Sequence, residues 1–326
     1  MTLTLPPARP APPAPPVVSR KNRHLARTLR SWAYVAPTAA LVLLFFVIPV
    51  VLVFVMSGSD WLLLGGNKGI NFPENYSEVL AHRSFWPAVW FTLEYTVIAT
   101  VLLIGLGLGL ALLVQEASRW RAFLRTVILV PTALGLASAS LLFYALYSPQ
   151  VGPISPMLQK LGLADGPVTV LGSPSGALWS TVFLIVWRYA GFYMLLLLVG
   201  LQSIPSDVYE AARIDGARTR QIFRSITLPL LRPSLALATI MCVTGSLLAF
   251  DQFYILTKGG PDGSTTTVVL LVYNLAFESK RNLGMAAALS VLVLLALVVI
   301  NAFQLRALGG SDGGGRTKKR KKEVAA

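Results

Sequence analysis

The sequence predicts an all-α polytopic membrane protein with six transmembrane helices. Of its 326 residues, 55% are hydrophobic and only 13% are charged, whereas a soluble domain carries about 25% charged residues. Six apolar runs reach the length of about 20 residues that a helix needs to cross the hydrocarbon core. The alternation of barrel strands is absent, and backbone groups in lipid must be paired within their own segment. Each run is therefore predicted to be a helix.

Three regions follow one another along the chain. Residues 1–31 are basic and rich in proline and alanine, without periodicity, and are predicted to be disordered. Residues 32–306 form the predicted membrane domain, whose first apolar run is too long for a cleaved signal peptide. Residues 307–326 are a glycine-rich linker and a basic tail, which is expected to lie against anionic headgroups. The predicted spans are 32–56, 87–114, 125–147, 176–201, 234–257 and 284–306.

Lysine and arginine residues predict the sidedness of the spans. The two ends of the chain and the second and fourth links hold 21 of them, whereas the other three links hold six. Cytoplasmic segments carry this excess, so both termini and the link between the fourth and fifth spans are predicted to be cytoplasmic. The net charge of +14 is explained by this asymmetry, and no nucleic-acid partner is predicted.

Few residues in the apolar runs suit a metal site. Cys242 is the only cysteine, and the two histidines, His24 and His82, lie outside the runs, so no metal site is predicted. Gly105 and Gly109 of the second span form a G-x-x-x-G pattern with a further glycine between them. Such small-residue faces allow close packing of helices.

The link between the fourth and fifth spans is much longer than a turn requires. It covers residues 205–233 and contains five arginines. Ser206 can cap a first helix, and Gly216 suits the left-handed residue that ends it. A second amphipathic stretch follows, with Ile222 and Phe223 on its apolar face. The residues alone leave two interpretations open: an interfacial helix resting on lipid, or a surface that docks a protein.

The order of residues in this link resembles the EAA loop of ABC-importer permeases, the membrane subunits of binding-protein-dependent uptake systems. The matching residues are Glu210, Ala211 and Ala212, then Asp215, Gly216 and Ala217, then Ile226, Thr227, Leu228 and Pro229. Similarity to the sugar-importer branch, and specifically to its maltose-F-like half, covers about residues 32–305. It includes Phe250, Asp251, Gly259, Gly260, Pro261, Tyr273 and Phe277.

The resemblance implies a fold like that of type I ABC importers and a place in a larger assembly. The chain would pair with a second permease as a heterodimer, with two ATP-binding subunits and an extracytoplasmic solute-binding protein, in a bacterial or archaeal cell membrane. It has no G-x-x-x-x-G-K-[ST] motif, so it is predicted to be no enzyme, to hold no cofactor, and to leave ATP and Mg to the ATPase. The residues expected to serve coupling are Glu210, Ala211, Ala212, Asp215, Gly216, Leu228 and Pro229.

Two helix faces are predicted to line the path of a sugar. The residues on them are Arg188 and Phe192 of the fourth span, Cys242, Ser246 and Phe250 of the fifth, and Asp251 beside them. Charges inside spans are costly and face a cavity or a partner. Arg188 is therefore open to two interpretations: an ion pair with Glu94 or Asp251, or a polar lining. As a lining residue it could also accept an anionic sugar.

The chief alternative function is a secondary, ion-coupled transporter. Such a protein needs ion-coupling acids buried at mid-span, for which this chain offers few candidates. An intramembrane enzyme is disfavoured because the spans contain no nucleophile–base pair or metal cluster.

Overall fold

The computed structural model describes residues 34–162, 165–278 and 281–309. The proline-rich start and nearly all of the basic tail lie outside the described residues. The chain divides into two compact units, residues 1–52 and 53–326. The described residues of the first unit are helical from Tyr34 and include the π-helical segment η1 (Leu43–Val47). The helix continues as α2 (Ile48–Ser57) into the second unit.

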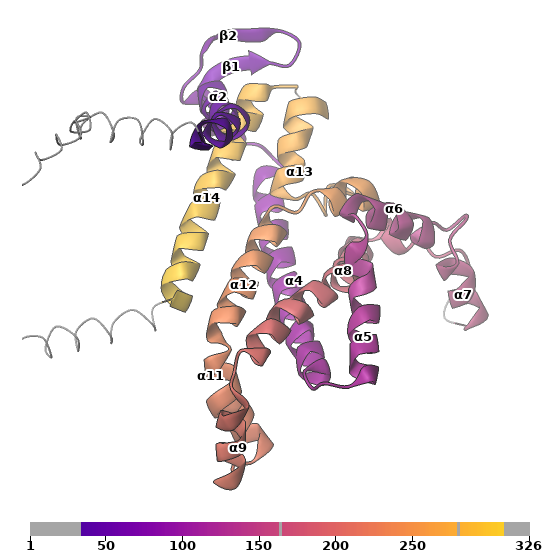
Figure 1. The fold of residues 1–326 in the computed structure, drawn as a ribbon. Helices are drawn as coiled ribbons and strands as arrows, with labels where there is room; N and C mark the ends of the chain where they lie inside the picture. The colour runs from indigo at the N-terminus through magenta and orange to yellow at the C-terminus, as the bar shows by residue number, and fades with distance from the viewer. Residues whose placement is uncertain (1–33, 163–164, 279–280, 310–326) are drawn as a thin grey trace, which may run out of the picture. The chain divides into compact units, whose positions relative to one another are not determined.

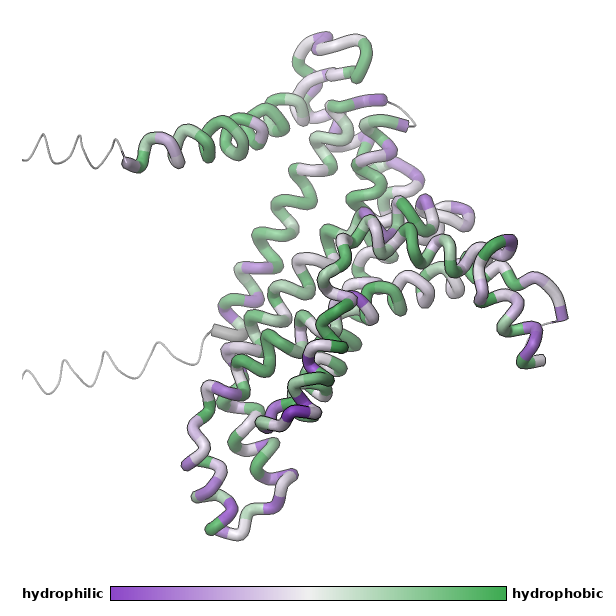
Figure 2. The backbone as a smooth tube through the Cα atoms, turned by 45° about the vertical axis from the view of Figure 1, so that its right-hand side comes forward, coloured by the Kyte–Doolittle hydropathy of each residue, from purple (hydrophilic) through white to green (hydrophobic). Residues whose placement is uncertain are grey.

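Four helices are long and apolar enough to cross a membrane without a break, and they correspond to predicted spans. They are Tyr34–Ser57, α4 (Phe85–Val114), α8 (Pro174–Gln202) and most of α14 (Leu283–Gly309) (Figure 1). Figure 2 shows mostly hydrophobic residues along the long helices, and hydrophilic residues at the lower end of the second unit and in the hairpin and connections elsewhere. Two further pairs of helices pass the same test as bent spans, which gives the six spans that the sequence predicts.

The third span is broken, although the sequence predicts one helix over 125–147. The segment made of α5 (Arg119–Leu129) and η2 (Val130–Ala133) turns by 91° into α6 (Leu136–Tyr147). Pro131 and Gly135 lie at the turn, where proline and glycine interrupt a helix. The Leu134 carbonyl, which this break frees, accepts a hydrogen bond from Arg188 Nε at 2.9 Å.

The fifth span is also broken: residues 248–250 interrupt the single helix predicted over 234–257, and the chain is helical again from Asp251. Helix α12 (Arg232–Leu247) meets the preceding segment at an angle of 66° and ends well before residue 257. A π-helical segment, η5 (Phe253–Thr257), follows the interruption. The carbonyl of Ala249 in the gap accepts a hydrogen bond from Thr267 Oγ1 at 2.8 Å. The backbone carbonyl exposed by the break is thus hydrogen-bonded within the protein, as a membrane interior requires.

Several short elements lie outside the predicted spans. A hairpin of β1 (Ser59–Leu62) and β2 (Gly66–Ile70) and the helix α3 (Glu74–Leu80) follow the first span. An apolar helix of two parts, α13 (Val268–Tyr273) and η6 (Asn274–Glu278), precedes the last span and is too short to cross a membrane. Two more short elements, α7 (Ile154–Lys160) and η3 (Val170–Gly172), lie between the third and fourth spans.

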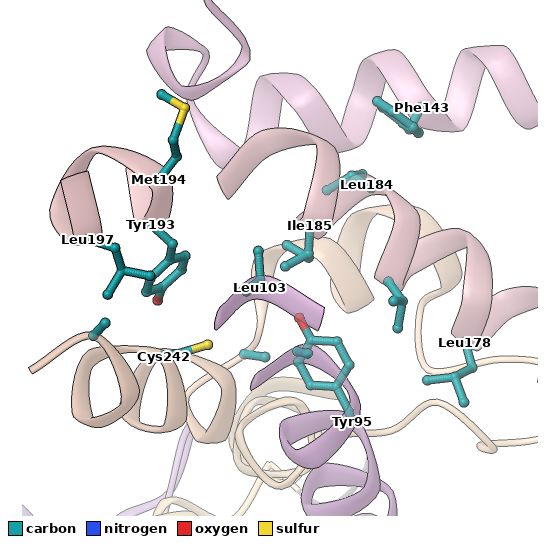
Figure 3. Packing of buried hydrophobic residues seen from close by; sticks show 14 of the residues in the cluster. Tyr95, Leu103, Phe143, Leu178, Leu184, Ile185, Tyr193, Met194, Leu197 and Cys242 are labelled. Carbon is teal, nitrogen blue, oxygen red and sulfur yellow. The ribbon is translucent and has the colours of Figure 1, made fainter. Parts of the chain in front are cut away.

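The core of the second unit forms where α4, α8 and α12 approach one another. Figure 3 shows Leu103, Ile185, Tyr193 and Cys242 converging between these helices. The approach of α4 to α8 is close because Gly107 has no side chain: a Cβ there would lie 2.9 Å from Tyr193 Cβ.

This close contact lies two positions away from the residues of the predicted packing face. The G-x-x-x-G pattern pointed to Gly105 and Gly109, but a Cβ at either of them meets nothing within 4 Å. Within this chain the small residue that the packing needs is Gly107, which lies between them and on a different face of the helix.

Candidate functional site

The segment over residues 205–233 folds as a helix, a tight turn and a second helix, as predicted. Helix α9 (Ser206–Ile214) is followed by α10 (Thr219–Ile222), η4 (Phe223–Thr227) and α11 (Leu228–Leu230). In Figure 1 α9 lies at the lower end of the second unit, opposite the β1–β2 hairpin. The segment therefore projects beyond the long helices.

Gly216 ends α9 in the left-handed conformation, with a φ of +76°. The amide of Gly216 donates to the Arg213 carbonyl at 3.1 Å, and the amide of Ala217 donates to the Ala212 carbonyl at 2.9 Å. These two bonds form a Schellman motif, which satisfies the last carbonyls of a helix and favours glycine at this position.

The start of α9 differs from the prediction that Ser206 caps it. Pro205 occupies the cap position and makes no side-chain hydrogen bond there, while Ser206 is the first helical residue. The Ser206 hydroxyl instead donates to Asp207 Oδ1 at 3.3 Å. Asp207 lies in the first turn, where a negative charge stabilises the exposed amides of a helix N-terminus.

The seven residues predicted to serve coupling differ in exposure. Glu210, Ala211, Asp215 and Gly216 are exposed, Leu228 and Pro229 are half-buried, and Ala212 is buried. Beside them Ile214 is 85% exposed, although it is apolar and ends the helix. A single exposed apolar side chain is common on protein surfaces, so Ile214 marks an accessible position at the end of α9.

A groove of about 950 Å³ separates this segment from the end of α4. Gln115 and Glu116 line one side, and Glu210, Arg213 and Arg220 line the other. The two helical parts of the segment are tied together by the hydroxyls of Tyr209 and Thr227, 3.3 Å apart. The groove is thus lined by acidic and basic side chains, and the contact between the two hydroxyls holds the helical parts of the segment together.

Arginines from α5 hold the end of α4 beside this groove. Arg125 Nε donates to the Val114 carbonyl at 2.9 Å, and Arg121 forms a salt bridge with Glu116. Cations at a helix C-terminus pair with its unsatisfied carbonyls. These contacts give the basic link between the second and third spans a structural role.

A second candidate site is a cavity of about 320 Å³ between α4, α8 and the broken fifth span. Arg188 and Cys242 do not line it, and Cys242 is only 1% exposed and belongs to the core. Phe250 lies beyond the end of α12, so it shares no continuous helix face with Cys242 and Ser246. The residues predicted for the substrate path that do line the cavity are Phe192, Ser246, Phe250 and Asp251.

Arg188 is held by the bend in the third span. Its Nε donates to the Leu134 carbonyl, and its own carbonyl accepts a hydrogen bond from Thr132 Oγ1 at 2.9 Å. Its guanidinium carbon lies 4.2 Å from the centre of the Tyr189 ring. The side chain is therefore engaged by the backbone and by an aromatic face.

The ion pair considered for Arg188 does not form. Within the described part of the chain the only salt bridge is the one between Arg121 and Glu116, so neither Glu94 nor Asp251 pairs with Arg188. The bend in the third span, which the sequence did not predict, supplies the Leu134 carbonyl that takes the place of a carboxylate.

Two polar residues of the cavity were missed by sequence reasoning. Gln252 is 3% exposed and donates from Nε2 to the Tyr95 hydroxyl at 3.2 Å. Its Oε1 has no hydrogen-bond partner among the described residues, and a buried unpaired acceptor is costly. Tyr95 and Gln252 are 157 residues apart, so only the fold brings them together. The available signal was the position of Gln252 beside Asp251.

Aromatic side chains gather next to this cavity. Phe250 stacks on Tyr254 at an interplanar angle of 13°, and the Tyr254 and Tyr273 hydroxyls lie 3.2 Å apart. Phe277 extends the cluster from Tyr273.

No group of three or more metal-ligating side chains that could hold a metal ion occurs among the described residues.

Comparisons with known proteins place these features in a wider group. The family model described as "Binding-protein-dependent transport system inner membrane component" matches residues 19–306. The chain is 36% identical over 266 residues to the "Trehalose/maltose transport system permease protein MalF" of Thermococcus litoralis, covering 79% of this chain and 86% of that protein. It is 33% identical over 278 residues to the "Multiple sugar-binding transport system permease protein MsmF" of Streptococcus mutans, covering 84% of this chain and 93% of that protein.

A solved structure shares the fold. It is described as "Crystal structure of bacterial alginate ABC transporter in complex with alginate pentasaccharide-bound periplasmic protein". The TM-score is 0.78 at 22% sequence identity, over 91% of this chain and 100% of the chain compared. At this identity the likeness concerns the fold, and it agrees with the six spans described above.

Proposed function

The chain belongs to the family of binding-protein-dependent transport system inner membrane components, and from this premise we propose that it carries a neutral sugar through an ABC importer. It is a multi-pass permease subunit of such an importer. The alternative of a secondary, ion-coupled transporter finds no support in the comparisons. The relatives named for trehalose, maltose and multiple sugars favour a sugar as the solute.

The observation that carries the proposal is the rigid helix–turn–helix segment over residues 205–233. The energy of ATP hydrolysis has to be transmitted to the spans from another subunit, because this sequence contains no P-loop. We assign the energy input to α9 and the Gly216 turn, with ATP and Mg bound by the partner ATPase. The segment continues through Leu231, which is completely buried, into α12. A displacement of α9 would therefore be transmitted to the fifth span, which lines the central cavity.

The chemistry of the cavity supports a neutral sugar. Aromatic side chains of Tyr189, Phe192 and Phe250 can pack on the apolar faces of a sugar ring, and a few polar groups can orient its hydroxyls. Asp251 is the only charged residue among those that line the cavity. Because Arg188 is not among the lining residues, the lining provides no cation for an anionic sugar.

The assembly that we propose contains this permease, a second permease as its heterodimeric partner, two ATP-binding subunits and an extracytoplasmic solute-binding protein. Both termini and the 205–233 segment would face the cytoplasm, as the distribution of lysine and arginine predicts. ATP would close the ATPase pair, and α9 would carry that motion into the spans. The spans would then open outward and receive sugar from the binding protein.

Replacement of Gly216 tests this proposal. Proline fixes φ near −65°, which is incompatible with the observed +76°. Gly216→Pro is therefore expected to lower ATP-driven uptake by more than about tenfold in proteoliposomes, while the protein still inserts into the membrane. Asparagine tolerates the left-handed region, and a Cβ at this position meets nothing within 4 Å. Gly216→Asn is thus the matched control and should retain most of the activity.

The two variants separate the possible outcomes. Normal ATP-driven uptake by Gly216→Pro would contradict the coupling role of the segment. Equal losses in both variants would show that the turn geometry is not what matters.

A further inference from the structure

A second cavity lies at the other end of the helix pair that borders the central cavity. Helix α6 and the η5 segment lie side by side, and Leu136 at the start of α6 and Phe250 shortly before η5 line the central cavity. Tyr144, near the end of α6, and Thr257, the last residue of η5, line a separate cavity of about 340 Å³. Tyr144 follows Leu136 by eight residues, which is about 12 Å along a helix. We call this second cavity the outer cavity.

The lining of the outer cavity is neutral and partly aromatic. None of the described residues that line it is charged. Tyr144 is 52% exposed, so much of its ring is accessible. The Ser148 hydroxyl donates to Gln150 Oε1 at 3.1 Å, which leaves the hydrogens on Gln150 Nε2 for another acceptor. An accessible aromatic ring beside neutral hydrogen-bonding groups suits the apolar face and the hydroxyl groups of a sugar.

Hydrogen bonds hold the walls of the outer cavity in place. Thr265 is completely buried, and its Oγ1 lies 2.8 Å from Thr257 Oγ1 and 2.7 Å from the Gly260 carbonyl oxygen. On the side of α6, the Tyr147 hydroxyl donates to the Ser180 carbonyl at 3.3 Å. A site whose walls are already fixed loses little conformational entropy when a ligand binds.

The outer cavity is built largely from two links of the proposed topology. Residues 148–150 and 169–172 belong to the link between the third and fourth spans, and residues 260–261 belong to the link between the fifth and sixth. The distribution of lysine and arginine predicts that both links are extracytoplasmic. A sugar delivered by the binding protein would therefore reach the outer cavity before the central one.

We propose that the outer cavity is a second binding site for a neutral sugar, which the solute occupies before it enters the central cavity. The inference rests on the proposed function, because it takes the class of solute and the sidedness given there. A sugar ring packs on Tyr144, and one of its hydroxyls accepts a hydrogen bond from Gln150 Nε2. An anionic sugar would lose hydration at this site without gaining a charged partner.

A fluorescent probe on Val151→Cys tests the outer cavity in the complete transporter in nanodiscs, without binding protein. Position 151 is 82% exposed and follows Gln150 directly, whereas the native Cys242 is 1% exposed and should not react. Maltose and trehalose, two neutral disaccharides, are the titrants. Each is expected to change the emission in a saturable way.

Two aromatic replacements in the probe-bearing transporter show whether this signal depends on the outer cavity. Tyr144→Ala is expected to raise the dissociation constant about three- to tenfold, because the sugar loses its aromatic contact. The matched control is Trp90→Ala, which removes an aromatic side chain that is 70% exposed on α4 and lines neither cavity. It should change the dissociation constant by less than about twofold.

A third variant separates the outer cavity from the central one. Phe192 lines the central cavity and not the outer one. Phe192→Ala is therefore expected to lower ATP-driven uptake and to leave the titration at position 151 unchanged. An equal rise of the dissociation constant in Phe192→Ala and Tyr144→Ala would overturn the proposal, because the probe would then report on the central cavity.

Three other results would also overturn the proposal. They are the absence of a saturable change with both sugars, equal affinities in Tyr144→Ala and the parent, and shielding of the sugar-free probe from iodide. The last result would show that a protein segment of the assembly fills the outer cavity.

Uptake by the unmodified transporter, with its binding protein and ATP, separates this inference from the proposed function. If neither sugar is taken up, the proposed function fails. If uptake occurs and the titration at position 151 shows no binding, only the assignment of the outer cavity fails.

Discussion

At the scale of single residues, Arg188 is bound to the protein backbone at a bend. Its Nε and its carbonyl make reciprocal hydrogen bonds to Leu134 and Thr132, which lie at and just before the 91° turn in the third span. A charged donor to a carbonyl contributes about 1.5–3 kcal/mol. The guanidinium Nε therefore joins the fourth span to the bend of the third, and Arg188 does not line the central cavity.

Replacement of Arg188 by alanine is expected to lower uptake of neutral and anionic sugars by the same factor. The loss should be accompanied by a lower unfolding temperature of the purified protein, because the bend loses its hydrogen-bond donor. Uptake of both sugar classes and thermal unfolding in detergent are the measurements. A selective loss of anionic uptake at unchanged stability would instead make Arg188 a substrate contact.

Helical spacing did not decide which of the predicted residues line the cavity. Phe192 of α8 lines the cavity, which its place on the fourth span suggested. Gln252 was missed because its partner Tyr95 is 157 residues away, a separation that no local pattern bridges. Cys242 was expected to line the path but is buried in the core. A spacing of four residues gives a helix face and does not say which neighbour covers it.

At the scale of helices, the contact between α4 and α8 depends on Gly107, the middle one of three closely spaced glycines in α4. Gly107→Ala is expected to destabilise the protein by about 1–3 kcal/mol, because the added methyl overpacks against Tyr193. Gly105→Ala and Gly109→Ala are the matched controls on the same helix. They should be neutral or slightly stabilising, since a Cβ there meets nothing within 4 Å and alanine favours a helix.

Thermal unfolding of the single purified chain in detergent checks this contrast. Equal losses in all three variants would show that helix α4 is sensitive to any added methyl group, and the close-approach explanation would be incorrect.

Helix boundaries were predictable for the unbroken spans and not for the broken ones. The run over 87–114 corresponds closely to α4, because apolar length alone defines such a helix. Pro131 and Gly135 were visible in the sequence as signals of the first break. The end of α12 at Leu247 is marked only by the pair Gly245 and Ser246, a weaker signal than a proline. That break is stabilised by Thr267, a partner from another segment.

At the scale of the molecule, two exposed segments lie at opposite ends of the second unit. The 205–233 segment is at one end and the β1–β2 hairpin is at the other, with the central cavity lined by α4, α8 and the broken fifth span. The fold class and the segment could be predicted, because hydropathy and residue order are local. The hairpin could not, because its stability comes from Asn75 and from the first turn of α14.

The proposed function depends above all on contact between the 205–233 segment and the ATPase. The opposing interpretation is that this segment only rests on lipid. A photoreactive amino acid in place of Ile214, which is 85% exposed at the end of α9, tests this contact in the assembled transporter. The same group in place of Ile70, which is 92% exposed on the hairpin, is the control for the opposite face. Irradiation is expected to give an adduct with the ATPase subunit from position 214 and none with the ATPase from position 70. Adducts with lipid alone at position 214 would contradict the coupling role of the segment.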